Sequence, residues 1–471
     1  MNLSSHITDK VFRTVGECAA QQGIQAFVIG GFVRDLVLGR PCKDIDFVTD
    51  GSGIELAQAV ANAMTVRKVD VFKNFGTAHF RYGDLDIEFV GARKESYSEH
   101  TRKPAVERGT LHEDQRRRDF TINALAVSLQ AENFGEVIDP FHGLDDLKGK
   151  ILRTPLDADI TYSDDPLRMM RAIRFACQLG FVIEEESLAA IKRNAARLKI
   201  VSMERITTEV NKVMMCNKPS AGFKLMFDTE LLHQFFPEMV KLHGVERRKG
   251  VAHKDNFYHT LQVLDNVCDS SSNLWLRWSA VLHDIAKPPT KRFDEDAGWT
   301  FHGHEDLGAR MVPKIFARLK LPLDHQMKYV QKMVQLHLRP IALTREEISD
   351  SAIRRLLFDA GDDIDELMLL CRADITSKNE AKVKRYLENY EVVKQKLVEL
   401  EAKDRIRNFQ PPVTGELIMQ TFGIGPGREI GIIKNAIKDA ILDGVIANDQ
   451  QQAYDYMLGE AKKLGLKNLK N

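Results

Sequence analysis

The residues best placed to do chemistry are two aspartates, Asp44 and Asp46, in the segment KDIDFVT. The alternation of polar and apolar residues predicts a β-strand, on which residues two apart share a face. Both carboxylates therefore point the same way, while Ile45 and Phe47 point to the opposite face. Two adjacent carboxylates repel each other, and a bound divalent cation relieves that repulsion. Because Mg²⁺ prefers oxygen ligands, this strand predicts a magnesium site.

A glycine pair stands shortly before these aspartates, in the segment FVIGGFVRDLVLG. FVI predicts a short buried strand, and FVRDLVLG predicts one or two helical turns. Gly30 and Gly31 let backbone N–H groups approach an anion, and the positive end of the helix dipole adds to that attraction. Arg34, one turn into the helix, can bind a phosphate through its guanidinium. Together with the aspartates, these residues predict a site for a nucleoside triphosphate and Mg²⁺.

The combined pattern GGxxRD…LG…DxD resembles the polymerase-β-like nucleotidyltransferase superfamily. Its form is similar to that of class II tRNA nucleotidyltransferases and bacterial poly(A) polymerases. The resemblance rests on specific motifs from about residue 20 to about residue 210 and is looser toward the C-terminus. It implies an α+β architecture, in which a head with a mixed sheet precedes a long helical body.

Two further segments of the head carry candidate site residues. In LDIEFVG, Glu88 shares a strand face with Asp86. The resemblance implies a third catalytic acid on a neighbouring strand, for which we choose Glu88, although an exposed strand face explains the pattern equally well. In RRRDFTINALA, the arginines, Arg118 among them, can neutralise a triphosphate. Asp119 and Asn123 lie four residues apart, hence on one helical face, and can bind a ribose hydroxyl.

The segment DDPLRMMRAIRFACQLGF predicts a helix that distinguishes nucleobases. Asp165 and Arg168 lie three residues apart and share a face, which Arg171 extends. Cytosine and adenine present an amino donor beside a ring-nitrogen acceptor, which suits a carboxylate beside a guanidinium. Uracil and guanine present the reverse, and each buried group left unpaired costs roughly 1–3 kcal/mol. Many members of the resembling family carry Glu where this chain has Asp164, a change that we expect to have no effect.

Two segments are expected to support this site. Residues 93–115 are polar and lack periodicity, which predicts a mobile loop beside the site. In the resembling enzymes such a loop helps to switch the incoming base. Farther along, Glu204 and Arg205 in ERITTEVNKVM are expected to brace the helix that carries Asp165.

A second set of metal-ligating residues lies in the C-terminal half of the chain. The residues are His259, His283, Asp284 and Asp374. A His–Asp pair flanked by a distant His and a distant Asp resembles the HD phosphohydrolase superfamily, which implies a metal that activates water for phosphoester hydrolysis. Imidazole and carboxylate ligands suit Mn²⁺, Ni²⁺, Fe²⁺ or Mg²⁺. His304 and His337 leave room for a second metal, and Lys287 can help to bind phosphate. An inert HD scaffold is the alternative.

The composition limits the partners. The 67 Lys and Arg residues equal the 67 Asp and Glu residues, so RNA binding must rest on local basic faces. The six cysteines form no CxxC pair, which favours reduced thiols in the cytoplasm. No apolar run approaches the roughly 20 residues of a membrane span, so we expect no membrane partner.

These observations predict four domains in 471 residues. They are a nucleotidyltransferase head at 1–155, a neck for nucleobase recognition and RNA binding at 156–245, an HD domain at 246–395 and a helical tail at 396–471. We expect the chain to add C, C and A to the 3′ end of tRNA from CTP and ATP, without a template and with release of pyrophosphate. We also expect HD phosphohydrolase activity. Its partners would be the 3′ end and acceptor region of tRNA, and not DNA.

Three other functions remain open. A bacterial poly(A) polymerase shares the head motifs, although its strongly basic tail is absent here. A partial enzyme that adds only CC or only A belongs to the same family, and the full-length segment 93–115 favours the complete activity. An RNA-associated HD phosphohydrolase with an inactive head would not need Asp44 and Asp46.

Overall fold

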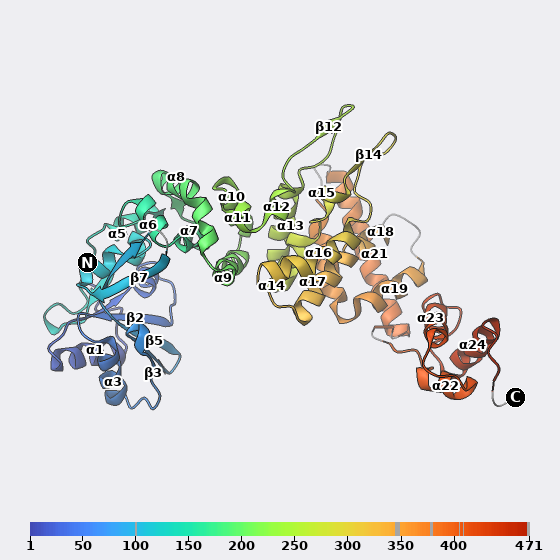
Figure 1. Ribbon diagram of the computed structural model, residues 1–471, viewed down its shortest axis with the longest axis horizontal. Helices are drawn as coiled ribbons and strands as arrows, with labels where there is room; N and C mark the ends of the chain where they lie inside the picture. The colour runs from blue at the N-terminus through green and yellow to red at the C-terminus, as the bar shows by residue number, and fades with distance from the viewer. Residues whose placement is uncertain (99–100, 344–348, 377–379, 405, 408, 469–471) are drawn as a thin grey trace. The chain divides into compact units, whose positions relative to one another are not determined.

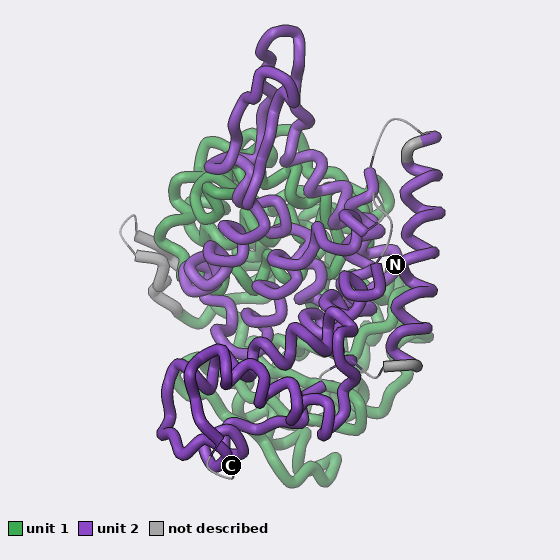
Figure 2. The backbone as a smooth tube through the Cα atoms, turned by 90° about the vertical axis from the view of Figure 1, so that its right-hand side faces the viewer, with its two compact units in different colours: residues 1–240 green, residues 241–471 purple. Residues whose placement is uncertain are grey.

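The structure of the chain, a computed structural model, has two compact units. It describes residues 1–98, 101–343, 349–376, 380–404, 406–407 and 409–468. Unit 1 comprises residues 1–240 and unit 2 comprises residues 241–471 (Figure 2). The predicted α+β class is confirmed, because a mixed sheet near the N-terminus precedes mainly helical regions (Figure 1). The four domain boundaries stay a prediction. Within the described ranges, no helix is both long and apolar enough to cross a membrane.

Unit 1 is built on a seven-stranded sheet. In spatial order, its strands are β3 (Asp70–Phe72), β4 (Thr77–Tyr82), β5 (Leu85–Gly91), β2 (Asp44–Thr49), β1 (Ala26–Ile29), β8 (Ala126–Ser128) and β9 (Val137–Ile138). The pairing of β2 with β5 is parallel, and the other pairings are antiparallel. The central strands are therefore those that carry the predicted carboxylates.

Helices α1 (Lys10–Gln21) and α3 (Gly53–Ala63) pack on one face of this sheet. Phe47 of β2 lies in the core there, with its ring 5.9 Å from that of Phe12 and 5.1 Å from that of Phe89. Burial of these rings supplies the hydrophobic free energy that fixes the register of β2. Because side chains alternate along a strand, the same register sends the even-numbered residues, the aspartates among them, to the opposite face.

The predicted loop at 93–115 is wrong. The chain instead forms a hairpin of β6 (Arg93–Ser98) and β7 (Thr101–Arg108), followed by helix α4 (Leu111–Arg116). The hairpin is held by main-chain pairing along its length, which needs no apolar face and so leaves no hydrophobic period in the sequence. Thr110 and Glu113 form a capping box that starts α4, since each side chain accepts a hydrogen bond from the other's backbone N–H.

The described part of unit 1 also has a short parallel strand pair, three short 3₁₀ segments at 73–75, 131–133 and 195–200, and further helices. They are η2 (Thr121–Asn123), a 3₁₀ turn, and the α-helices α2 (Gly31–Val37), α5 (Gly143–Gly149), α6 (Ala158–Asp164), α7 (Leu167–Leu179), α8 (Glu185–Asn194), α9 (Met203–Met214), α10 (Pro219–Asp228), α11 (Leu231–Phe235) and α12 (Pro237–Val240). The strand pair is β10 (Ile151–Leu152) with β11 (Val182–Ile183). Helix α7 lies within the segment that was predicted to be helical, and Gly180 ends it with a left-handed φ of 71°.

Unit 2 is helical, with two hairpins that the sequence analysis did not predict. Its helices are α13 (Asn256–Cys268), α14 (Leu274–Leu282), α15 (Lys287–Thr290), α16 (His304–Arg318), α17 (His325–Leu336), α18 (Arg339–Leu343), α19 (Asp350–Ala360), α20 (Ile364–Asp374), α21 (Glu380–Asp404), α22 (Gly415–Phe422), α23 (Arg428–Leu442) and α24 (Gln450–Lys463). The hairpins are β12 (Arg247–Arg248) with β13 (Val251–Ala252), and β14 (Arg292–Asp294) with β15 (Gly298–Thr300).

Candidate active site and metal centre

The predicted carboxylates gather where β2 lies beside β5. Parallel pairing places Asp46 opposite Glu88 and Asp44 opposite Asp86. Partial burial raises the pKa of Asp46, and the neighbouring Asp44 raises it further, while Arg118 opposes both effects. Burial and Asp46 together raise the pKa of Glu88. Carboxylates that raise one another's pKa form the kind of crowded oxygen site that a divalent cation stabilises.

Asp86 differs from its neighbours. It accepts hydrogen bonds from Arg81 Nε at 2.8 Å and Arg81 Nη2 at 3.2 Å, and it lies 3.3 Å from His79 Nε2. The hydrogen bonds from Arg81 are the main reason that the pKa of Asp86 is lowered. Glu88, rather than Asp86, is thus the acid of β5 that interacts with Asp46.

The glycine turn meets this site directly. Gly30 begins α2 with a φ of 82°, a left-handed conformation that favours glycine. A Cβ atom at Gly30 would lie 3.0 Å from Arg118 Nη1 and 3.8 Å from Asp46 Oδ2. A side chain would therefore occupy the space that the turn, the arginine and the carboxylate share. Arg118 is itself held by Asp114, whose Oδ2 accepts hydrogen bonds from its Nε and Nη2 at 3.2 and 3.1 Å.

Arg34 is bound by protein groups. Its Nε and Nη2 donate to the two carboxylate oxygens of Asp35 at 2.9 and 2.8 Å, and its Nη1 donates to Asn123 Oδ1 at 2.8 Å. The guanidinium is buried and lies 5.0 Å from the ring centre of Phe175. In this arrangement Arg34 positions other side chains, and its predicted contact with a phosphate stays a prediction. The sequence analysis did not assign a role to Asp35, which follows Arg34 directly.

Asp119 and Asn123 lie together, but not on the helical face that was predicted. The α-helix expected over them is wrong, because Asp119 precedes the short 3₁₀ turn η2 that ends at Asn123. Asp119 accepts from Asn123 Nδ2 at 3.1 Å and from Arg171 Nε at 2.7 Å. Burial works to raise the pKa of Asp119, but Arg171 and Asn123 outweigh it and hold that pKa below its usual value. The ion pair fixes α7 against the segment around η2.

Asp165 and Arg168, which were predicted to distinguish bases, contact different parts of the protein. Asp165 Oδ1 accepts from the backbone N–H of Leu167 at 3.2 Å, at the start of α7. Arg168 donates through Nη2 to the backbone carbonyl of Arg117 at 2.6 Å. Arg168 also lines a cavity of about 240 Å³. The other lining residues are Lys94, Glu113, Arg116, Arg117, Leu156, Thr161 and Asp164. Asp164, to which the sequence analysis gave no role, thus lies with Arg168 around this cavity.

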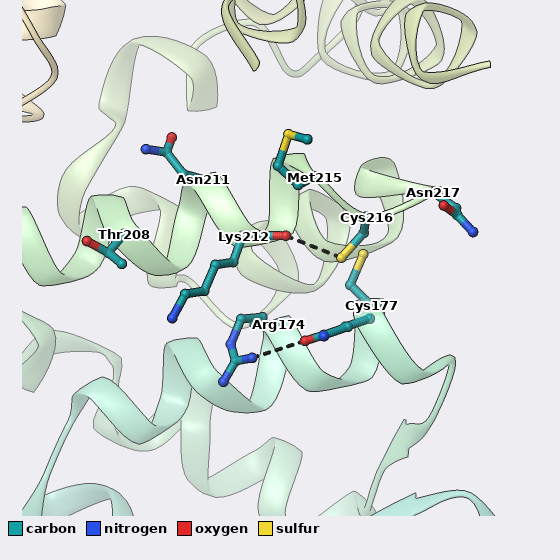
Figure 3. A pocket seen from close by; sticks show the side chains of 9 residues that line it. Arg174, Cys177, Thr208, Asn211, Lys212, Met215, Cys216 and Asn217 are labelled. Atoms are coloured by element: carbon teal, nitrogen blue, oxygen red, sulfur yellow. Dashed lines mark hydrogen bonds between the residues drawn. The ribbon is translucent and has the colours of Figure 1, made fainter. Parts of the chain in front are cut away.

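The brace between α9 and α7 comes from Glu209. Arg174 of α7 donates to Glu209 Oε2 at 2.6 Å, and both side chains are buried. The predicted braces, Glu204 and Arg205, lie in the first turn of α9 and are exposed instead. Figure 3 shows Arg174 and Lys212 on the two helices, around a cavity of about 690 Å³.

Loss of this brace is expected to destabilise unit 1. Replacing Arg174 with methionine leaves Glu209 buried beside Lys212 alone, whose Nζ is 3.4 Å from Oε1. We expect the free energy of unfolding to fall by about 3 kcal/mol, because a buried charge loses its main partner. Arg193→Met is the matched control, since Arg193 pairs with Asp159 on the surface and its loss should lower the free energy of unfolding much less. Urea denaturation measures both, and equal losses would contradict the brace.

The second candidate site lies among the helices of unit 2, which bring distant residues together. Its side chains are His259 in α13, His283 and Asp284 after α14, His304 at the start of α16, His337 after α17 and Asp374 at the end of α20. Asp284 is at the centre, because it belongs to two groups of closely spaced ligand atoms. The groups are His259, His283 and Asp284, and Asp284, His304 and His337.

Each carboxylate oxygen of Asp284 faces one group. Oδ2 lies 3.5 Å from His259 Nε2 and 3.2 Å from His283 Nε2. Oδ1 lies 3.2 Å from His304 Nε2 and 4.0 Å from His337 Nε2. Asp374 completes the first group, with its Oδ1 at 2.9 Å from His259 Nε2 and 3.6 Å from His283 Nε2.

Hydrogen bonds from their Nδ1 atoms orient three of the imidazoles. The Nδ1 atoms of His283, His304 and His337 donate to the backbone carbonyls of Ala280, Phe301 and Val334 at 2.7, 2.7 and 2.6 Å. The Nε2 atoms of these histidines are buried without a hydrogen-bond partner. Buried polar atoms without partners are costly, and divalent metals satisfy such nitrogen and oxygen donors. The donor set therefore fits one metal on each side of Asp284.

The charges of the centre favour one proton on His283. Burial works to lower its pKa, but the carboxylates of Asp284 and Asp374 outweigh that effect and raise it to about 10. Burial and the charge of His283 lower the pKa of His337 to about 3. A metal bound by His283 must displace its proton, so metal binding strengthens as the pH rises.

Two lysines and a threonine border the centre. Lys287 Nζ is 2.6 Å from Asp284 Oδ2. Lys254 Nζ lies 2.7 Å from His259 Nδ1 and donates to Thr376 Oγ1 at 2.5 Å. The sequence analysis missed Lys254 and Thr376. Their only sequence signal is proximity, because Lys254 stands five residues before His259 and Thr376 two residues after Asp374.

Three family models match the chain. They are the poly A polymerase head domain over residues 26–153, the probable RNA and SrmB-binding site of polymerase A over 180–242 and the HD domain over 256–379. The multifunctional CCA protein of Shewanella frigidimarina is 30% identical over 368 residues, which cover 75% of this chain and 84% of that protein. The A-adding tRNA nucleotidyltransferase of Aquifex aeolicus is 41% identical over 189 residues, which cover 40% of this chain and only 23% of that protein.

Solved structures share the fold over most of the chain. The CCA-adding enzyme of Thermotoga maritima, complexed with tRNA, has a TM-score of 0.62 at 21% identity and covers 97% of both chains. A tRNA nucleotidyltransferase complexed with a primer tRNA and an incoming ATP analogue has a TM-score of 0.57 at 26% identity. The match covers 81% of this chain and 99% of that one.

Proposed function

Because this chain belongs to the family of multifunctional CCA proteins, we propose that it adds C, C and A to the 3′ end of tRNA from CTP and ATP. The observation that carries the proposal is the position of Asp46, which lies opposite Glu88 and close to Gly30 and Arg118. This arrangement places carboxylates beside an anion site, as phosphoryl transfer to a hydroxyl requires. We also propose a cytoplasmic location, where tRNA, CTP and ATP are available.

The site residues of unit 1 have different proposed roles in this reaction. Asp44 and Asp46 would hold Mg²⁺, with Glu88 as the third acid. Bound there, Mg²⁺ lowers the pKa of the primer 3′-hydroxyl and stabilises the pyrophosphate that leaves. The backbone at Gly30 and Gly31 and the guanidinium of Arg118 would hold the triphosphate. The remaining proposed contacts are those of Arg34 and Arg171 with phosphate, of Asp119 and Asn123 with the ribose, and of Asp165 and Arg168 with the base.

The test uses defined tRNA ends. Purified protein is incubated with tRNA that lacks CCA, and with tRNA that ends in CC, in the presence of each nucleoside triphosphate. Sequenced products ending in CCA are expected from both substrates. Addition of A to the CC end alone would identify an A-adding enzyme, and a run of A residues would identify a poly(A) polymerase. No incorporation at either end would overturn the nucleotidyltransferase assignment.

Base selection is expected to depend on Arg168. Replacing it with alanine removes the donor to the ring nitrogen of C and A, so the rate with CTP and ATP should fall and discrimination against UTP and GTP should shrink. Arg193→Ala, an exposed arginine of α8, is the control and should select like the unaltered protein. Single-nucleotide incorporation with all four triphosphates measures the ratio. Unchanged selectivity in Arg168→Ala would place base recognition elsewhere.

We also propose a second activity for the histidine and aspartate centre of unit 2, namely metal-dependent hydrolysis of phosphoesters such as 2′,3′-cyclic phosphates. The observation that favours it is the pair of ligand groups that share Asp284 around buried atoms without partners. Bound there, a metal such as Mn²⁺, Ni²⁺ or Mg²⁺ supplies an activated water. His259, His283, Asp284 and Asp374 would hold the first ion. This activity would let the protein repair damaged tRNA ends before it extends them.

A further inference from the structure

The two hairpins of unit 2 form one joint structure. Lys249 of the first hairpin pairs with Glu295 of the second, and Lys291 pairs with Glu246. Trp299 Nε1 also donates to the backbone carbonyl of Val251 at 3.2 Å. Figure 1 shows both hairpins extending from the helices of unit 2. These contacts hold the two hairpins in a defined relation to each other.

Beyond those ion pairs, the hairpins carry a surplus of positive charge. Arg247, Arg248 and Arg292 are exposed, and none of them pairs with an acidic group within the described ranges. Arg248 instead lies over the ring of Phe293, 4.8 Å from its centre. Three arginines without acidic partners repel one another, so the surface favours a polyanion. Together the segments 245–254 and 291–301 hold six Lys and Arg residues and four Asp and Glu residues, so the surplus is two positive charges.

Aromatic rings lie between these cations. Phe293 and Trp299 are half-buried, with ring centres 5.2 Å apart and nearly perpendicular planes. Lys291 Nζ lies 5.4 Å from the ring centre of Trp299. Cations interleaved with aromatic rings are the composition that binds single-stranded nucleic acids, because guanidinium groups neutralise phosphates and rings stack on bases. An acidic peptide would pair with the cations, but it has no planar base to stack on the aromatic rings.

A series of side-chain contacts connects these rings to the metal centre. The His253 ring is 5.3 Å from that of Trp299 and 6.0 Å from that of Phe301. Phe301 in turn lies 5.6 Å from Lys287 Nζ, which contacts Asp284. On the other side, Lys254 follows His253 in the chain and contacts His259. These contacts connect the hairpins to the residues that border the centre.

We propose that the joined hairpins, residues 245–254 and 291–301, bind single-stranded RNA and guide its terminal phosphate to the metal centre. This inference rests on the proposed phosphohydrolase function and adds the surface that would bind the RNA beside its end. A small phosphoester would enter the centre without touching Arg247, Arg248 or Arg292. The arginines are therefore expected to matter for long substrates alone.

The test compares a long and a short substrate in the full chain. The variant carries Arg247→Ala, Arg248→Ala and Arg292→Ala. With Mn²⁺ or Ni²⁺ present, kcat/KM is measured on a short single-stranded RNA that ends in a 2′,3′-cyclic phosphate and on 2′,3′-cyclic AMP. We expect kcat/KM to fall at least about tenfold for the RNA and to stay unchanged for cyclic AMP. The slope of log K against log salt for RNA binding should drop by roughly 2, because three phosphate contacts are lost.

Two controls sharpen the result. A variant with Arg310→Ala, Lys314→Ala and Lys328→Ala removes three exposed charges from other helices of unit 2 and should behave like the unaltered protein. Replacing the three hairpin arginines with lysines keeps the charge and should retain most of the salt dependence. Unchanged hydrolysis and binding of RNA in the hairpin variant would overturn the proposal. Equal losses on RNA and cyclic AMP would also overturn it, because they indicate damage to the centre.

Failure of the hydrolase proposal can be told apart from failure of this one. If the unaltered protein hydrolyses neither substrate with any metal, the second activity proposed above is wrong. The RNA surface is then tested by photo-crosslinking of a thiouridine-labelled single strand, with the crosslinked peptides identified by mass spectrometry. Crosslinks to residues 245–254 or 291–301 are expected, and crosslinks confined to other segments would overturn the docking surface.

Discussion

Replacing Asp46 with asparagine is expected to reduce nucleotide addition by roughly 10²–10³-fold or more, because a carboxylate ligand of the Mg²⁺ that stabilises the reacting phosphates is lost. The fold should survive. Burial and Asp44 raise the pKa of Asp46 in the folded chain, so its charged form is disfavoured there. When folding raises the pKa of a carboxyl group, that group stabilises the fold at pH values below its pKa in the unfolded chain. This stabilisation is lost as the pH rises through its pKa in the folded chain. At neutral pH, asparagine therefore removes no stabilising charge.

The matched control for this experiment is Asp86→Asn. Asp86 lies opposite Asp44 on the neighbouring strand but is engaged by Arg81 and His79. This variant should keep its activity. Incorporation of labelled CTP and ATP into tRNA measures addition, and thermal unfolding checks the fold. Near-normal incorporation by Asp46→Asn would remove that residue from the metal site. Equal losses in both variants would contradict a specific role for Asp46.

Replacing Asp284 with alanine is expected to abolish phosphoester hydrolysis and leave CCA addition unchanged. Asp284 belongs to both ligand groups, so its loss should reduce binding at both metal positions, whereas His304→Ala should weaken the second position alone. Metal content, measured by mass spectrometry on purified protein, reports this difference without relying on activity. Hydrolysis of 2′,3′-cyclic AMP and CCA addition are then measured on the same preparations.

Asp306→Ala serves as the control, because Asp306 is an exposed carboxylate on the same helix as His304. It should retain both the metals and the hydrolysis. Since Asp284→Ala leaves Lys287 and His283 without their carboxylate, Asp284→Asn is measured as well to preserve the shape of the centre. Full metal content in both Asp284 variants would contradict the shared-ligand arrangement. Loss of CCA addition as well would show that the centre supports unit 1.

The sequence predicted the parts of the fold whose residues alternate most clearly. The segments 27–29, 43–49 and 85–91 were predicted as strands, and each overlaps one in the structure. Burial on one face sets their period, so the pattern is visible without any tertiary knowledge. The same holds for the order of the histidines and aspartates of unit 2, whose side chains converge although they are far apart in the chain.

The elements that were missed lack such a period. The hairpin of β6 and β7 and the two hairpins of unit 2 are held by backbone pairing, which any residue except proline can supply. The four-residue spacing of Asp119 and Asn123 fits an α-helix as well as it fits the observed turn. The contact of Asp119 with Arg171, which spacing does not encode, is what belongs to the turn. Arg34 illustrates a further limit, because the adjacent Asp35 engages it through a side-chain contact that motif spacing does not encode.

The contacts of Phe175 have a mechanical consequence for repeated nucleotide addition. Its ring lies beside the guanidinium groups of Arg34, Arg171 and Arg174, at 5.0, 5.5 and 3.8 Å from its centre. Phe175 lies on α7 with Arg171 and Arg174, so only its contact with Arg34 joins α7 to α2. That contact contributes roughly 0.5–2 kcal/mol. Hydrogen bonds through Asn123 and Asp119 link Arg34 to Arg171 as well. We therefore expect α2 and α7 to move together, and the RNA end to be displaced between successive additions.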